Sequence, residues 1–558
     1  MQLELPAPPR PTVAHVRNAS RARGAYYTPA DAAHAMAGWA LRRGNEVVLE
    51  PSFGEGVFLR ALRDLKRARS WHEVAVHGAE IERETFQRTA SLHGETLERA
   101  HCTDFLSLAP FPVDVLIGNP PYVRLRHVDP GLAERALDIA NSVLESPMEP
   151  AGSLWMPFVL HSLRFLRDDG RLALVLPHEA TYVRYARPLW PLLGRRFGSL
   201  RIVRVQERLF PSILQSVVIL FADGYGGSTD QVRFDVYDTV SAFLKEHAQT
   251  AASIPISAIA QGHRPFVEAL LPPELRLLLP MLRSLTVEAK EKVDFHIGYV
   301  AGDKRYFHPT DQVVKDYHIP RASLVPSLTS ARRVSKQGLL TGRFKPGALS
   351  NLFLPHSPLA LTDGEKAYVA LGEANSISSR YKCRVREPWY VVPDVKVPDV
   401  LIPTFFERPL LLLNDAGAVA SNSFLCGYAR PGVVPAVFAA SWYTSLTLLE
   451  TEMQVHALGG GVLVFVPREA SRIRVIRSLP SVDLHHLELV GEAIQSGSID
   501  EAFHLGDGAL VRGGLGLTDH HLELVREGIL RLRTWRTSNP VRGLDEDLVQ
   551  EQVAVDEG

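Results

Sequence analysis

Short apolar runs alternate with helical patterns between residues 24 and 240, and this alternation constrains the fold more than any other feature of the sequence. The runs are rich in Val, Ile and Leu, and the segments between them are long enough for crossover helices. The apolar runs lie at residues 46–49, 74–76, 113–117, 171–176, 202–205, 217–221 and 232–237. We therefore predict a doubly wound α/β sheet for this part of the chain.

Changes in composition divide the 558 residues into four parts. Residues 1–23 are rich in Pro, Ala and Arg, so we expect a flexible basic arm. Residues 24–250 contain the sheet. In residues 251–545 the pattern becomes irregular, with many prolines, which indicates a mixed α+β domain, and residues 546–558 form an acidic tail.

Charge and cysteine content narrow the class of protein. A net charge of −1 gives no general attraction to nucleic acid, so DNA binding would depend on a local group of basic residues. Cys102, Cys383 and Cys426 are far apart, which disfavours a disulfide framework or a Cys-x-x-Cys metal site. The sequence contains no apolar run long enough to cross a bilayer. We expect a cytoplasmic protein that uses no metal and does not enter a membrane.

The first chemical signal is a strand that runs through Glu50 and Ser52 into Gly54-Glu55-Gly56. Glycines at such a turn let the backbone approach a ligand closely. Glu80 follows the next strand, and a carboxylate there can accept hydrogen bonds from both hydroxyls of a ribose. A plain tight turn and a solvated strand end are the alternative interpretations.

The stronger signal is Asn119-Pro120-Pro121-Tyr122, directly after the strand at 113–117. An adenine amine is a poor nucleophile because its lone pair is delocalised into the ring. The Asn119 side-chain carbonyl and the Pro120 main-chain carbonyl can accept both amine hydrogens, and the prolines hold that carbonyl in place by fixing φ. Tyr122 offers a flat face on which an extruded base can stack.

In residues 24–225 these motifs, in this order, resemble the gamma class of adenine-N6 DNA methyltransferases. The resemblance implies a Rossmann-like class I methyltransferase fold, S-adenosylmethionine as cofactor and double-stranded DNA as substrate. It implies a catalytic set of Asn119, Pro120, Tyr122 and Phe210, in which Phe210 gives the target base a second aromatic contact. The expected cofactor contacts are Thr28, Glu50, Ser52, Gly54, Glu80, Ile81, Asp104, Phe105 and Pro121.

The second domain resembles the target-recognition regions of that class, which vary with the DNA sequence each enzyme reads. No acidic residue occurs from Tyr317 to Thr362. Six basic residues in this stretch form a candidate phosphate-contacting set, here called the basic stripe: Arg321, Arg332, Arg333, Lys336, Arg343 and Lys345. A solvated basic face is the alternative interpretation.

Other functions compete with DNA adenine methylation. An RNA adenine methyltransferase or a protein-glutamine methyltransferase can use the same Asn-Pro-Pro-Tyr site, although the latter enzymes lack a large second domain. An inactive DNA-recognition subunit is a further alternative. Leucine spacing in residues 273–290 indicates a buried helix and not a nuclease site. We therefore expect the modification component of a bacterial restriction-modification or defence system, with a separate restriction endonuclease as a second candidate partner.

Overall fold

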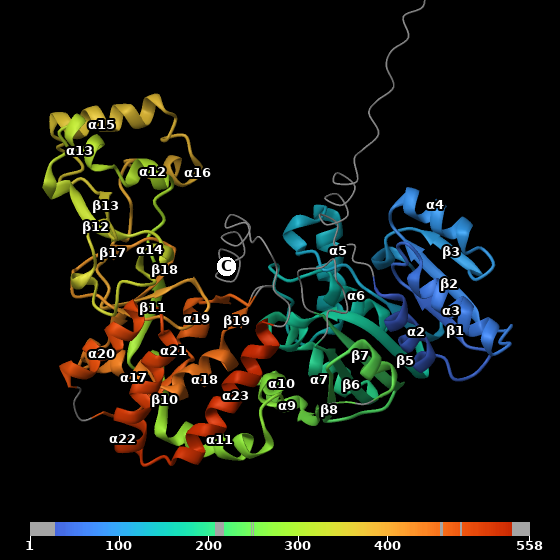
Figure 1. Ribbon diagram of the computed structural model, residues 1–558. Helices are drawn as coiled ribbons and strands as arrows, with labels where there is room; N and C mark the ends of the chain where they lie inside the picture. The colour runs from blue at the N-terminus through green and yellow to red at the C-terminus, as the bar shows by residue number, and fades with distance from the viewer. Residues whose placement is uncertain are drawn as a thin grey trace, which may run out of the picture. The chain divides into compact units, whose positions relative to one another are not determined.

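The computed structural model describes residues 28–206, 217–246, 248, 250–457, 461–479 and 483–537, and Figure 1 shows their helices and strands. The chain divides between Leu270 and Leu271 into two compact units. The basic arm at 1–23, Phe210 and the acidic tail at 546–558 lie outside the described residues. Within the described ranges, no helix is both long enough and apolar enough to span a membrane.

The first unit is built around one nine-stranded sheet in the order β3-β2-β1-β4-β5-β7-β6-β8-β9. Its strands are β1 (Val47–Glu50), β2 (Ala75–Glu80), β3 (Arg99–Cys102), β4 (Val113–Gly118), β5 (Leu166–Pro177), β6 (Phe197–Val205), β7 (Val217–Tyr225), β8 (Gln231–Tyr237) and β9 (Thr250–Pro255). Strands β1 to β5 are mutually parallel, and β7 lies antiparallel between β5 and β6. This is the class I methyltransferase arrangement, so the predicted doubly wound fold is confirmed.

Helices link these strands and cover the sheet. They are α2 (Ala30–Ala40), α3 (Val57–Ala68), α4 (Arg83–Leu92), α5 (Pro130–Val143), α6 (Trp155–Ser162), α7 (Leu189–Gly194), α8 (Val240–Leu244), α9 (Ile256–Ala260) and α10 (Pro265–Glu268). Helix α2 packs on α3 and also contacts β4 and β5, while α5 packs on α6. Because α9 contacts both β9 and α7, the first unit continues beyond the change in composition near residue 250.

The second unit begins with α11 (Pro273–Leu285), whose Leu275, Leu279 and Leu282 are buried, as the leucine spacing predicts. It contains small sheets formed by β10 (Thr286–Glu288), β11 (Val293–Ile297), β12 (Leu324–Leu328), β13 (Ser350–Phe353), β14 (Val400–Pro403), β15 (Phe405–Phe406), β16 (Leu412–Leu413), β17 (Val419–Ala420), β18 (Phe424–Ala429), β19 (His456–Ala457), β20 (Leu463–Val464) and β21 (Arg474–Ile476). Its other helices are α12 (Lys304–Phe307), α13 (Asp311–Asp316), α14 (Ala331–Val334), α15 (Asp363–Ala374), α16 (Tyr381–Arg384), α17 (Pro435–Trp442), α18 (Ser445–Gln454), α19 (Pro467–Ala470), α20 (Leu484–Gln495), α21 (Ile499–Gly506), α22 (Gly513–Leu515) and α23 (Asp519–Thr537).

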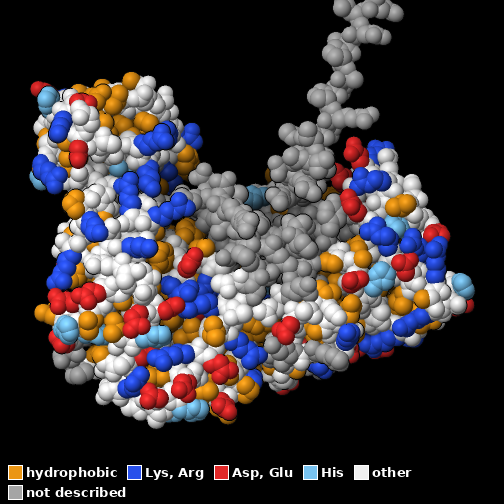
Figure 2. Space-filling model, in the orientation of Figure 1, with side chains coloured by type: hydrophobic (Ala, Val, Ile, Leu, Met, Phe, Trp, Pro, Cys, Tyr) orange, Lys and Arg blue, Asp and Glu red, His pale blue; other side chains and the backbone are white. Residues whose placement is uncertain are grey.

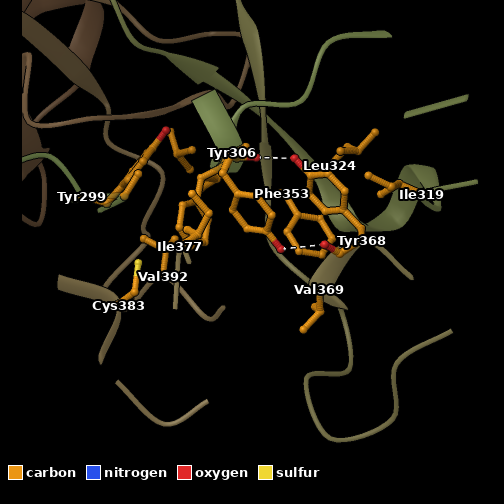
Figure 3. Close-up of a cluster of buried hydrophobic side chains, with 14 residues drawn as sticks. Tyr299, Tyr306, Ile319, Leu324, Phe353, Tyr368, Val369, Ile377, Cys383 and Val392 are labelled. Carbon is orange, nitrogen blue, oxygen red and sulfur yellow. Dashed lines mark hydrogen bonds between the residues drawn. The ribbon is translucent and has the colours of Figure 1, made fainter. Parts of the chain in front are cut away.

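Residues 299–395 of this unit form what we call the aromatic lobe, because three tyrosines and two phenylalanines lie in its buried core (Figure 3). The rings of Tyr306 and Tyr368 stack with centroids 4.7 Å apart and planes 3° from parallel. The Tyr306 hydroxyl donates to the Tyr368 carbonyl at 3.1 Å, and the Tyr368 hydroxyl donates to the Tyr306 carbonyl. The buried hydroxyls thus have partners, and the two chain segments are joined at this point.

Candidate functional site

The candidate site lies where β1, β2 and β4 end. These strands are parallel neighbours, with Val48 paired to Val76 on one side and to Val115 on the other. The loops that follow them therefore leave the same edge of the sheet, which is where open α/β sheets bind ligands. The order β2-β1-β4 brings together the glycine turn, Glu80 and Asn119, which are far apart in sequence.

The glycine turn is tied directly to Glu80. Gly54 and Gly56 have φ values of 51° and 75°, a region that side chains disfavour. A Cβ on Gly54 would meet no atom within 4 Å, so the backbone there borders open space. The Gly54 and Glu82 amides donate to the two Glu80 carboxylate oxygens at 3.0 and 2.9 Å. Each oxygen retains a lone pair that can accept a ribose hydroxyl.

Glu50 is a buried carboxylate in need of a partner. Its side chain is 1% exposed, and no donor from the described residues reaches its Oε2 atom. Burial, followed by the nearby Glu80 carboxylate, raises the pKa of Glu50 well above its usual value. A positively charged ligand with N–H donors would satisfy this group, so the orphaned oxygen fits a sulfonium cofactor that carries an amino group.

The expected binders of the cofactor adenine differ in how accessible they are. Ile81, directly after β2, is 62% exposed, which is unusual for a large apolar side chain. Phe105 is 2% exposed and packs on Phe158 and Phe165, with ring centroids 5.1 and 5.5 Å away. Asp104 already accepts a hydrogen bond from Arg135 at 2.7 Å. The contacts of Asp104 and Phe105 with the cofactor stay predictions.

Around Asn119 the structure brings several of the expected residues into one network. The Asn119 amide group donates to Thr28 Oγ1 at 3.4 Å, and Ser52 Oγ donates to the Asn119 main-chain carbonyl at 3.2 Å. The Tyr122 hydroxyl lies 2.6 Å from Asn119 Oδ1 and 3.0 Å from the Val175 carbonyl, and both atoms are acceptors. Because a hydroxyl has one proton, Tyr122 divides it between the asparagine and β5.

A second network, which the sequence analysis did not identify, holds the chain just beyond Tyr122. Arg124 donates to Glu179 at 3.1 Å, and the Tyr185 hydroxyl donates to the same carboxylate at 2.7 Å. The Trp155 indole N–H then donates to the Tyr185 hydroxyl at 2.9 Å. The network connects the loop after β4 to the loop after β5. The only sequence signal is that Arg124 and Glu179 each closely follow a strand end.

In the second unit, all six residues of the basic stripe are exposed. Arg343 and Arg333 are among those that have polar partners on the surface. Arg343 forms an ion pair with Glu488 at 3.1 Å, and Arg333 donates to Ser350 Oγ at the same distance. Because they are exposed, the side chains of the basic stripe are accessible to a ligand. Their contact with DNA phosphates stays a prediction.

Two protein-family models match the chain. Residues 13–186 match the family N-6 DNA Methylase. Residues 263–511 match the family Type II methyltransferase M.Eco57I, C-terminal domain. The first match covers the glycine turn, Glu80 and the Asn119–Tyr122 motif, and the second covers the aromatic lobe.

Curated relatives include the Type II methyltransferase M.AccI of Acinetobacter calcoaceticus, which is 23% identical over 476 residues, or 80% of this chain and 84% of that protein. The Type II methyltransferase M.PaeR7I of Pseudomonas aeruginosa is 32% identical over 178 residues, or 27% of this chain and 30% of its own length.

Among solved structures, the type IIL restriction-modification enzyme MmeI in complex with DNA aligns with a TM-score of 0.48 at 12% identity, covering 95% of this chain and 74% of MmeI. The type IIG restriction endonuclease BpuSI aligns with a TM-score of 0.43 at 13% identity, covering 94% of this chain and 67% of BpuSI.

Proposed function

We propose that this chain, which carries an N-6 DNA methylase domain followed by a Type II methyltransferase C-terminal domain, extrudes a target adenine from duplex DNA and methylates its N6 amine at the end of β4. The two domains identify it as an adenine-specific DNA methyltransferase, the modification component of a restriction-modification system. A separate restriction endonuclease that reads the same sequence is the proposed partner of such a component.

The observation that supports this site best is the placement of Asn119 between Thr28, Ser52 and Tyr122. The target amine would donate one hydrogen to Asn119 Oδ1 and the other to the Pro120 carbonyl, which draws the nitrogen toward a tetrahedral geometry. Tyr122 would then give its proton wholly to the Val175 carbonyl, which already lies 3.0 Å away. The chain thus contains an alternative acceptor that frees Asn119 Oδ1 for the base.

The cofactor would be held by residues at the ends of β1 and β2, and it supplies a methyl group on a positively charged sulfur. Glu80 would accept the ribose hydroxyls while its own hydrogen bonds to Gly54 and Glu82 keep it oriented. Glu50 would face the positive charge. Ile81 and Pro121 would enclose the adenine ring, with Asp104 and Phe105 beside it. Each of these groups binds or orients the cofactor, and none of them forms or breaks a covalent bond.

Extrusion of the adenine follows from the position of the site. An edge of a parallel sheet cannot reach an amine inside a stacked duplex, so the base must leave the helix. Tyr122 is 8% exposed and its hydroxyl lies 3.0 Å from the Val175 carbonyl, so its ring has a fixed position. It is the proposed first wall of the base pocket. Phe210 is the proposed second wall.

The test is to incubate the purified chain with labelled S-adenosylmethionine and with duplex DNA, RNA or protein extract in parallel. We expect label only in DNA, and single-molecule sequencing should place it on adenine within one short motif. Label in RNA alone or on glutamine side chains would support one of the two rival enzymes. Cofactor binding without transfer to any substrate would support an inactive recognition subunit.

A further inference from the structure

The aromatic lobe carries a second group of basic residues, which lies outside the stretch of sequence that forms the basic stripe. Residues 380–386 have the sequence Arg-Tyr-Lys-Cys-Arg-Val-Arg, and we call them the basic-aromatic segment. Tyr381 is 65% exposed and Val385 is 64% exposed, and Val300 beside them is 36% exposed. Large apolar side chains exposed together in this way indicate a contact surface.

Contacts of Cys383 and Arg386 hold the basic-aromatic segment in place. Cys383 is completely buried in the aromatic core (Figure 3), and a Cβ on Gly302 would lie 2.8 Å from its sulfur. Arg386 donates to the Ala301 carbonyl at 2.9 Å and also to the Val300 carbonyl. Two neighbouring segments are therefore fixed to each other, and the exposed side chains project from a rigid frame.

The charges on this surface are open to a ligand. Arg380 pairs with Asp303, but among the described residues no carboxylate lies within ion-pairing distance of Lys304, Arg305, Lys382 or Arg384. Lys382 and Arg384 lie over the Tyr381 ring, 5.7 and 5.4 Å from its centroid. Figure 2 shows Lys and Arg side chains over α12 and α16. This excess of positive charge matches an anionic partner.

The two basic surfaces differ in composition. From residue 321 to 345, all of which are described, no large apolar side chain is exposed, so the stripe offers charge alone. The basic-aromatic segment combines charge with exposed Tyr and Val. Phosphates need only positive charge, whereas base edges in the major groove also present thymine methyl groups and paired acceptors on guanine.

We propose that the basic-aromatic segment enters the major groove of duplex DNA and reads base edges, while the basic stripe contacts phosphates. The assignment rests on the proposed function, and it names the residues that set sequence specificity. Arg384 is the residue suited to a guanine edge, because its guanidinium can donate two parallel hydrogen bonds. Val385 and Val300 are suited to a thymine methyl group.

The experiment first maps the wild-type methylation motif on plasmid DNA by single-molecule sequencing. The full-length Arg384→Ala, Arg384→Lys and Tyr381→Ala variants are then mapped in the same way. Arg321→Ala is the matched control, since it removes an exposed arginine of the stripe from the same lobe. Cofactor affinity and thermal unfolding, measured for each variant, establish that it is folded.

We expect Arg384→Ala to lower discrimination at one base pair of the motif by about fivefold to 150-fold, the range for one bidentate contact. Arg384→Lys should lose part of that discrimination while keeping affinity, because the charge remains but the planar guanidinium with its two parallel donors is lost. Arg321→Ala should keep the motif unchanged and weaken binding to all sequences alike.

Two results would overturn the proposal. If folded Arg384→Ala, Arg384→Lys and Tyr381→Ala proteins all retain the wild-type motif and discrimination, the segment does not read bases. If the wild-type chain methylates no adenine in DNA, the proposed function fails and the assignment fails with it. Wild-type methylation with an unchanged motif in the variants contradicts only the assignment.

Discussion

The candidate functional side chains at the edge of the nine-stranded sheet and those of the aromatic lobe differ in their exposure to solvent. At the sheet edge, Glu50 and Tyr122 are buried and Asn119 is bound on several sides by its neighbours. In the aromatic lobe the core is made of packed side chains, and the residues of the basic stripe, with Lys382 and Arg384, are exposed. A reaction needs groups held at fixed geometry, whereas recognition of a long polyanion needs groups that are accessible. The predictions below test this contrast, from the largest expected effect to the smallest.

Asn119→Ala should abolish methyl transfer while cofactor affinity stays nearly unchanged, because Asn119 acts on the target amine. Removing one well-placed polar stabiliser costs about a hundredfold or more in turnover. Single-turnover methylation and calorimetry of cofactor binding measure the two quantities. A variant that retains more than about a tenth of wild-type turnover would remove Asn119 from the reaction.

Tyr122→Ala should weaken binding of the extruded base by about 1–3 kcal/mol, the usual value of one stacking contact. Tyr122→Phe keeps the ring and loses only the hydrogen bonds to Asn119 and Val175, so it should keep most activity. A fluorescent base analogue at the target position reports extrusion. A mismatch opposite the target should tighten wild-type binding and partly rescue Tyr122→Ala, and indifference to the mismatch would contradict base extrusion.

Glu80→Ala should weaken cofactor binding by about tenfold to a hundredfold, because hydrogen bonds between a charged acceptor and ribose are lost. The Gly54 amide would lose its acceptor at the same time. Calorimetry measures the affinity, and Glu84→Ala on the exposed surface of α4 is the matched control. Equal affinities for both variants would mean that Glu80 only terminates a strand.

Cofactor binding should release a proton from Glu50. Its pKa is raised, through burial and the neighbouring Glu80 and despite Arg60, so the free protein holds a proton there at pH values above the usual 4.5. A positive ligand favours the ionised form, so affinity should rise with pH, by up to about tenfold per unit, until the raised pKa is passed. Calorimetry in buffers of different ionisation enthalpy detects the proton. Glu50→Gln should lose this dependence, and an unchanged dependence in that variant would exclude Glu50 as its source.

Alanine at both Arg332 and Arg333 should weaken DNA binding equally for all sequences. Each lost phosphate contact lowers the slope of log affinity against log salt by about 1, which amounts to a few-fold in affinity at moderate salt. Fluorescence anisotropy over a range of salt concentrations measures both. An unchanged slope would show that the basic stripe is a solvated face. The basic-aromatic segment would then be the remaining candidate for DNA contact in the aromatic lobe.

The sequence predicted the sheet well where strands are buried and poorly at its edges. Strands β1, β2 and β4 to β8 appear as apolar runs in the sequence because most of their side chains are buried. Strand β3, with the sequence Arg-Ala-His-Cys, and β9 are edge strands, so their composition did not identify them.

The same reasoning applies to the candidate site. Asn119 and Glu80 could be named because the chemistry demands those residue types beside a strand end. The bond between Tyr122 and Val175 and the network around Glu179 join residues more than 50 positions apart, or in neighbouring loops, and no local pattern reports them. The aromatic core of the lobe, and thus the position of the basic-aromatic segment, follows only from tertiary packing.

The mutual hydrogen bonds of Tyr306 and Tyr368 affect which substitutions the aromatic lobe can accept during evolution. They fix the lobe from inside, and the exposed side chains that we propose to face DNA contribute little to its folding free energy, since most surface substitutions change that energy by less than about 0.5 kcal/mol. Lineages can therefore exchange the exposed residues one at a time while every intermediate still folds. A methyltransferase of this design can acquire a new target sequence by ordinary mutation, as long as the buried tyrosine pair is inherited intact.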